Sequence, residues 1–137
     1  MAVADVNKIV RDYLTTSSTV ADPLIALVST RIYSPRLAKN ATLPAISFFS
    51  RGGTSTPYIP GIVEPSFQFD CWADDPEEAR NIYRKLYDAL QGIQNIEVGS
   101  YDIMSAIEEV QGQDLVDVEI DNYFRVLTFF RIMIRAE

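Results

Sequence analysis

The sequence of 137 residues contains no histidine and only one cysteine, Cys71. Without histidine the chain lacks the side chain most used for proton transfer near neutral pH, which excludes Ser-His, Cys-His and most zinc sites. A single cysteine excludes an internal disulfide and a multi-cysteine metal site, and it is typical of a reducing compartment. No apolar run approaches the roughly 20 residues of a membrane span. These absences favour a soluble protein and leave few catalytic mechanisms open to it.

Positive charge is also scarce, since 12 Lys and Arg stand against 19 Asp and Glu, for a net charge of −7. Such a chain repels phosphate backbones unless its basic residues gather on one face, so sequence-specific nucleic-acid binding is not expected. Residues 1–8 show no basic leader followed by an apolar stretch, and nothing there resembles a secretory signal. We therefore expect the protein to originate in the cytoplasm.

The sequence has the length and the 47% hydrophobic content of one globular domain spanning residues 1–137. Helical spacing of apolar residues predicts helices over 3–14, 22–28 and 76–90, the last beginning with the cap signal Asp75-Pro76. Strand patterns occur over 44–49, 67–72, 96–98, 101–110 and 123–135. The order predicts an α+β domain with a mainly antiparallel four- or five-stranded sheet and helices packed on one face.

The last predicted strand has two different faces. One face is apolar enough to lie in the core and comprises Phe124, Val126, Thr128, Phe130, Ile132 and Ile134. The other face mixes Arg125, Arg131 and Arg135 with Leu127, Phe129 and Met133. The arginines could follow a phosphate backbone, but Arg interleaved with aromatic and aliphatic residues is more typical of a protein interface. We favour contact with another protein.

A Gly- and Pro-rich stretch over 51–65 predicts a long loop, and long loops often carry function. Its apolar residues Tyr58, Ile59, Ile62 and Val63 have little to pack against, so we hypothesise that they contact a neighbouring subunit or another protein of the same assembly. The predicted interface therefore comprises Tyr58, Ile59, Ile62, Val63, Arg125, Phe129, Arg131 and Arg135.

Two further features could in principle supply chemistry, one as a nucleophile and one as a metal site. Cys71 alternates with outward residues beside Phe67 and Phe69, which predicts a buried apolar thiol rather than a nucleophile. The acidic segment 114–121 contains Asp114, Asp117, Glu119 and Asp121 and could bind a hard cation, but it lacks the glycine of a calcium loop. We predict no catalytic, cofactor-binding or metal residues. The role of residues 108–121 stays open.

The motif order resembles the bacteriophage tail-completion family, also called tail terminators or head–tail joining proteins, over nearly the whole chain. The matching motifs are Ala26-Leu27-Val28, Arg31-Ile32-Tyr33, Leu43-Pro44-Ala45-Ile46, Phe67-Gln68-Phe69-Asp70-Cys71-Trp72-Ala73, the helix with Glu78-Ala79 and Leu86 to Leu90, and Tyr123-Phe124-Arg125-Val126. The stretch 93–122 is longer and more acidic than the family pattern.

The resemblance implies a virion subunit in the tail or neck that assembles from the host cytoplasm. It implies a closed ring, usually a hexamer, which caps the tail tube and joins it to the head connector. DNA passes through such a ring without sequence-specific contact, and neither a cofactor nor a membrane is involved. The rival interpretations are another phage neck or connector protein, or a small metal-dependent binding protein or enzyme that uses residues 114–121.

Overall fold

The computed structural model describes residues 5–18, 21–34, 42–55, 62–116 and 124–136. Within these ranges the chain forms three helices and six strands. The helices are α1 (Val6–Thr15), α2 (Asp22–Val28) and α3 (Pro76–Leu90). The strands are β1 (Ile32–Tyr33), β2 (Ala45–Ser55), β3 (Ile62–Ala73), β4 (Gln94–Val98), β5 (Tyr101–Val116) and β6 (Phe124–Ala136). No helix of the described part is long and apolar enough to cross a membrane.

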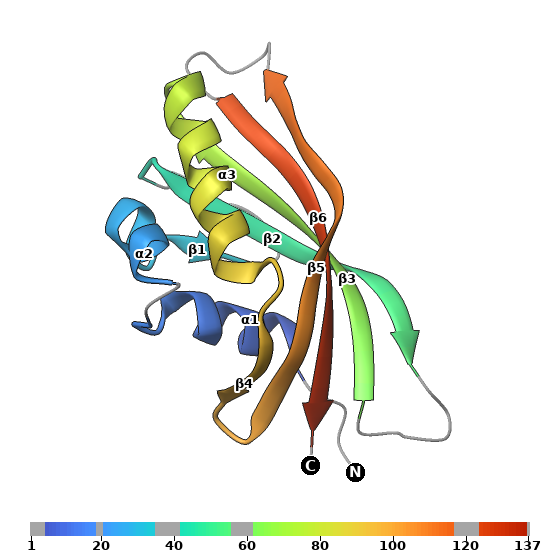
Figure 1. Ribbon diagram of the computed structural model, residues 1–137. Coiled ribbons are helices and arrows are strands. Elements are labelled where there is room, and N and C mark those ends of the chain that lie inside the picture. Colours follow the sequence, from blue (N-terminus) through green and yellow to red (C-terminus); the bar gives the residue numbers. More distant parts are fainter. Residues whose placement is uncertain (1–4, 19–20, 35–41, 56–61, 117–123, 137) are drawn as a thin grey trace.

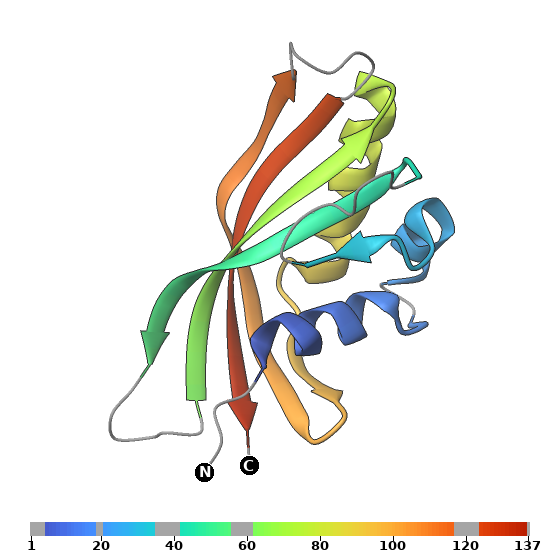
Figure 2. The ribbon, with the colours of Figure 1, turned by 180° about the vertical axis from the view of Figure 1, so that it is seen from behind.

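The described strands form one six-stranded sheet in the order β1-β2-β3-β6-β5-β4. β1 runs parallel to β2, and the other neighbouring strands run antiparallel. The sheet is strongly twisted and curls into a half-barrel, with the helices on its open side (Figures 1 and 2). The predicted fold class, a mainly antiparallel sheet of four or five strands, is therefore wrong, because the sheet is mixed and has six strands.

The strand count was underestimated because β1 is too short to show a pattern. It contains only Ile32 and Tyr33, which pair with Ile46 and Ser47 of β2. Two residues cannot display the period of two that marks a strand in a sequence. Their parallel pairing depends on where α1 and α2 bring the chain back to the sheet, which is a non-local effect.

The predicted loop over 51–65 is in large part strand. β2 continues to Ser55 and β3 begins at Ile62. The glycines lie at a register shift between Ser50 and Gly53, where the strand pairing is irregular. Gly53 has a φ of 142°, and a Cβ there would overlap the carbonyl oxygen of Glu64. Glycine is therefore required at this bulge because the two strands approach too closely for a side chain.

Helix α1 packs against both edges of the curled sheet. It contacts β1 and β2 on one side and β4 on the other, so it bridges the first and last strands of the sheet order. Its buried residues are Ile9, Val10, Tyr13 and Leu14. Asp5 caps the helix by accepting a hydrogen bond from the backbone N–H of Lys8 at 3.3 Å.

Helix α3 confirms the prediction made from its start signal. The Asp75 carboxylate accepts a hydrogen bond from the backbone N–H of Glu77 at 3.0 Å, and Pro76 takes the first helical position. The helix packs on β3, β5 and β6. Its buried face is Ala79, Ile82, Tyr83, Leu86, Ala89 and Leu90.

The core contains four fully buried phenylalanines, Phe48, Phe67, Phe69 and Phe130. The rings of Phe48 and Phe69 stack at 5.2 Å between centroids, and Phe130 meets Phe69 edge to face at 5.7 Å. Cys71 is fully buried beside them, which confirms the prediction of a buried apolar thiol. The inward face of β6 is also as predicted, from Val126 to Ile134.

β5 is irregular, and α3 stabilises its irregular part. Three register shifts against β6 lie between Ile103 and Gln113, and such bulges increase strand twist. The Tyr83 hydroxyl donates to the Glu108 carboxylate at 2.7 Å and accepts from the Gly112 N–H at 3.2 Å. The Gln91 side-chain oxygen accepts from the Glu108 N–H at 2.7 Å. These bonds satisfy backbone groups on the edge of β5 that β4 does not cover.

Candidate assembly surface

The two features that the sequence offered for chemistry, Cys71 and the acidic segment, do not form a nucleophilic or metal site in the described residues. Cys71 is fully buried, and this burial, with a smaller effect of the nearby Asp70 charge, raises the pKa of its thiol far above the ordinary value of 9.0. No group of three or more metal-binding side chains occurs among the described residues. In the acidic segment, Asp114 belongs to β5, while residues 117–121 lie outside the described ranges.

The side of the sheet opposite the helices carries a continuous set of polar and apolar residues. Cross-strand pairing places Trp72 opposite Arg125, Gln68 opposite Phe129, and Phe129 in turn opposite Val110. Because directly paired residues share a face, these side chains form one surface. We call it the helix-free face, and it comprises Gln68, Asp70, Trp72, Ile107, Val110, Arg125, Leu127, Phe129, Arg131, Met133 and Arg135.

Each predicted arginine on this face has an acidic partner. Arg131 lies 3.4 Å from Glu64 and 3.3 Å from Glu109. Arg135 lies 2.8 Å from Asp102. Arg125 lies 3.7 Å from Asp70. The arginines therefore do not form a uniformly basic stripe, and this neutralisation favours the protein-contact interpretation over a phosphate-binding one.

Aromatic rings and exposed aliphatic side chains complete the helix-free face. The guanidinium of Arg51, which comes from β2 on the far side of β3, lies 4.1 Å from the ring centroid of Phe129 on β6. Ile107 is 56% exposed and Val110 is 38% exposed. Aromatic, Met and Arg side chains with few unpaired charges are the composition enriched at protein interfaces. The helix-free face therefore has a composition suited to binding another protein.

Asp70 is the most buried charged group on the helix-free face. It is 5% exposed, and burial raises its pKa, while the positive charge of Arg125 and a weak contact with Gln68 partly oppose the rise. Within the described residues, Oδ1 of Asp70 and Nε of Arg125 are buried without a hydrogen-bond partner. The neighbouring Trp72 donates its indole N–H to the Ser47 hydroxyl at 2.9 Å.

The structure brings together part of the predicted interface. Arg125, Phe129, Arg131 and Arg135 share the helix-free face. Ile62 is paired with Arg135, whereas Val63 is paired with Ile134 and packs against the core. Tyr58 and Ile59 lie outside the described residues.

Sequence reasoning missed the partners of the arginines and the two exposed aliphatic residues. Glu64 and Glu109 converge on Arg131 from strands on either side of β6. Their pairing depends on the strand order, which no local pattern shows. The exposure of Ile107 was partly indicated by the sequence, because apolar residues over 101–110 occur at both odd and even positions. In a strand these positions point to opposite faces.

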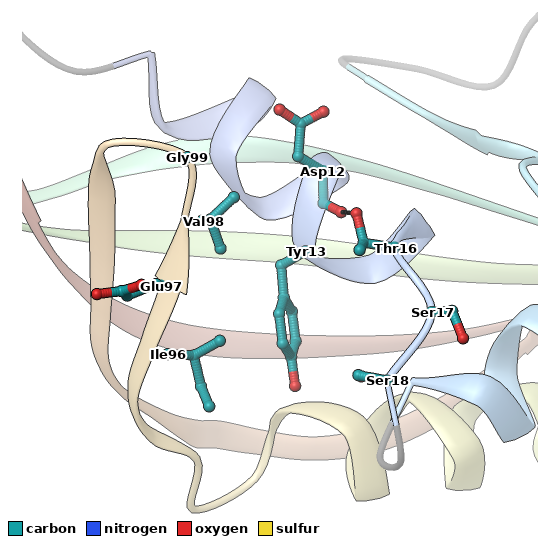
Figure 3. Close-up of a pocket in the computed structure, with 9 residues that line it drawn as sticks. All are labelled: Asp12, Tyr13, Thr16, Ser17, Ser18, Ile96, Glu97, Val98 and Gly99. Atoms are coloured by element: carbon teal, nitrogen blue, oxygen red, sulfur yellow. Dashed lines mark hydrogen bonds between the residues drawn. The ribbon is translucent and has the colours of Figure 1, made fainter.

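A groove of about 420 Å³ lies between α1 and β4 (Figure 3). It is lined by Asp12, Tyr13, Thr16, Ser17, Ser18, Ile96, Glu97, Val98 and Gly99. The side chains of Ile96 and Val98 point toward the ring of Tyr13, while Glu97 points away (Figure 3). The Tyr13 hydroxyl donates to the backbone oxygen of Ala89 at 2.6 Å, which fixes the ring as one wall.

The described residues form a small α/β fold in which helices close a curled mixed sheet, and among them no helix packs on the other sheet face. The same fold occurs in a chain of the virion of a native gene transfer agent (GTA) particle. The two chains superpose with a TM-score of 0.64 at 16% sequence identity, over 98% of this chain and 100% of that chain. No protein-family model matches the sequence, and no curated protein matches it. At this identity the likeness shows a common fold.

Proposed function

We propose that this protein is a structural subunit of a phage-like virion. The observation that carries the proposal is the fold shared with a virion chain over nearly the full length of both chains. The resemblance of the motif order to tail-completion proteins supports the same class. The helix-free face, whose arginines are paired with acidic side chains, is suited to protein contacts.

The proposal extends to the place in the particle. The chain acts as one domain, residues 1–137, in a ring-forming tail terminator at the tail or neck. The ring, a hexamer, caps the tail tube and meets the head connector, and DNA passes through it. Cyclic rings use two different patches on each subunit, which meet head to tail until the ring closes. The helix-free face supplies one patch, and the chain around Tyr58 and Ile59 supplies the other.

The experiment measures mass in solution by size-exclusion chromatography with light scattering, with and without the cognate tail-tube protein. A ring-sized species, alone or on the tube, is expected. Ile107→Asp should abolish it because a charge enters the contact, yet Ile107 is exposed, so the midpoint of thermal unfolding should stay within a few degrees.

Tyr87→Ser is the matched control, because Tyr87 is 37% exposed on α3, away from the helix-free face. It should leave assembly unchanged. The second patch is tested by replacing Tyr58 and Ile59 with Ser, which should also block assembly while the monomer stays folded. A protein that stays monomeric and does not bind the tube would overturn the terminator proposal. Normal assembly of the Ile107→Asp variant would show that the helix-free face is not a ring contact.

A further inference from the structure

The groove between α1 and β4 runs along an open strand edge. β4 is the last strand in the sheet order and pairs with β5, from Gln94 opposite Ser105 to Val98 opposite Tyr101. Within the described residues its other edge therefore has no strand partner. Backbone N–H and C=O groups on such an edge are a ready template for one more strand.

The floor of the groove is apolar and follows the period of a strand. Ile96 and Val98 are partly buried and turned toward Tyr13, with Glu97 on the opposite side between them (Figure 3). A segment added beside β4 would direct alternate side chains into the same space. The volume of about 420 Å³ is within the roughly 300–1,000 Å³ of small-ligand sites, so it has room for an apolar side chain.

The rim of the groove is negative. Its lining includes Asp12 and Glu97 but no Lys or Arg. The last turn of α1 has no basic residue, so no cationic side chain in that turn offsets the partial negative charge of this helix end. Lys8 pairs with Asp12 at 3.0 Å, but both side chains are exposed, and such surface pairs contribute little free energy.

We propose that this groove binds an extended segment of a partner protein that adds to the open edge of β4, inserts one apolar side chain between Ile96, Val98 and Tyr13, and carries Lys or Arg on either side of it. In an added strand the flanking residues face away from the groove floor, on the side of Glu97. Their cations then lie across from its carboxylate, as in opposite-charge cross-strand pairs. The inference goes beyond the proposed function, because the surface is separate from the helix-free face and binds whether or not a ring forms.

The test uses the full chain labelled with ¹⁵N, titrated with a short extended peptide and followed by two-dimensional NMR. The probe is the pentapeptide acetyl-Thr-Lys-Val-Lys-Thr-amide, and the comparison peptides replace both Lys with Gln or with Glu. Saturable shifts of the amide signals of residues 96–99 and 16–18 are expected with the Lys peptide. The Gln peptide should bind more weakly, and the Glu peptide should not bind.

Two exposed carboxylates provide a matched pair of variants. Glu97→Gln should weaken binding of the Lys peptide about two- to fivefold, the scale of one exposed ion pair. Glu77→Gln, on exposed α3 surface away from the groove, should leave it unchanged. Absence of saturable shifts at 96–99, or equal binding of the Lys and Glu peptides, would overturn the proposal. Because Ile107 does not line the groove, normal peptide binding by Ile107→Asp separates this result from a failure of ring assembly.

Discussion

The guanidinium of Arg125 lies over the indole ring of Trp72, with its central carbon 5.1 Å from the ring centroid. The two residues are direct cross-strand neighbours on β6 and β3. The same arginine also faces the carboxylate of Asp70 at 3.7 Å, so the strand pairing holds a cation between an aromatic face and a buried acid. Because Asp70 is buried, its pKa is raised, and its contribution to the stability of the folded state depends on pH.

We expect Asp70 to make the folded state less stable as the pH rises. Its pKa is raised above the ordinary 3.8 by burial, so the folded protein holds this proton more tightly than the unfolded chain does. The resulting stability is present below the unfolded pKa and is lost as the pH rises through the folded pKa. Asp70→Asn removes this dependence.

Urea unfolding of the wild type and of Asp70→Asn between about pH 3 and pH 7 checks this prediction. The free energy of unfolding of the variant minus that of the wild type should increase with pH across the window. The subtraction cancels the other carboxyl groups, which are common to both proteins. A difference independent of pH would contradict the prediction.

Gly112 is expected to be necessary for the packing of α3 on β5. A Cβ at this position would lie 2.9 Å from Cζ of Tyr83 and 2.9 Å from Cγ1 of Val126. Gly112→Ala should therefore lower the free energy of unfolding by about 1–3 kcal/mol, the usual cost of overpacking. Urea unfolding measures it, and Gln113→Ala, at an exposed neighbouring position, is the control that should change little.

Two tyrosines provide a comparison of a buried and an exposed hydroxyl. Tyr13→Phe removes the hydrogen bond to the Ala89 oxygen at 2.6 Å, and it should cost about 0.5–1.5 kcal/mol of unfolding free energy. Burial also raises the pKa of Tyr13 above 10.0, so its contribution should disappear at strongly alkaline pH. Tyr87→Phe, at a 37% exposed side chain, should be nearly neutral. Equal losses in both variants would show that the buried bond contributes nothing.

Duplex DNA should bind only weakly, because acids neutralise the arginines of the helix-free face and the net charge is −7. Fluorescence anisotropy at about 150 mM salt should give a dissociation constant no tighter than the 10⁻⁴–10⁻⁶ M typical of non-specific contact. Replacing Glu64 and Glu109 with Gln frees Arg131 and should strengthen the binding. Nanomolar affinity with a steep salt dependence in the wild type would instead favour the phosphate-binding interpretation.

Local signals in the sequence were sufficient for several elements. Asp75 and Pro76 predicted the start of α3, because capping and a fixed φ act within one helical turn. Alternation in 67–72 placed Cys71 in the core, and alternation in β6 separated a buried face from one carrying Arg and Phe. These features follow from the periods of helix and strand, which any short window contains.

Only the tertiary structure decided the rest. The parallel pairing of Ile32 with Ile46, the bulge at Gly53 and the neighbours of Arg131 all join residues that are distant in the chain or displaced in register. Strand order brings Glu64 and Glu109 to the same arginine, and α1 forms the groove beside β4 only because the sheet curls far enough for one helix to reach both of its ends. The sequence by itself determined which residues of α3 and β6 face the core. The twist and order of the strands determined which residues meet on the surface, because that depends on contacts between segments rather than within them.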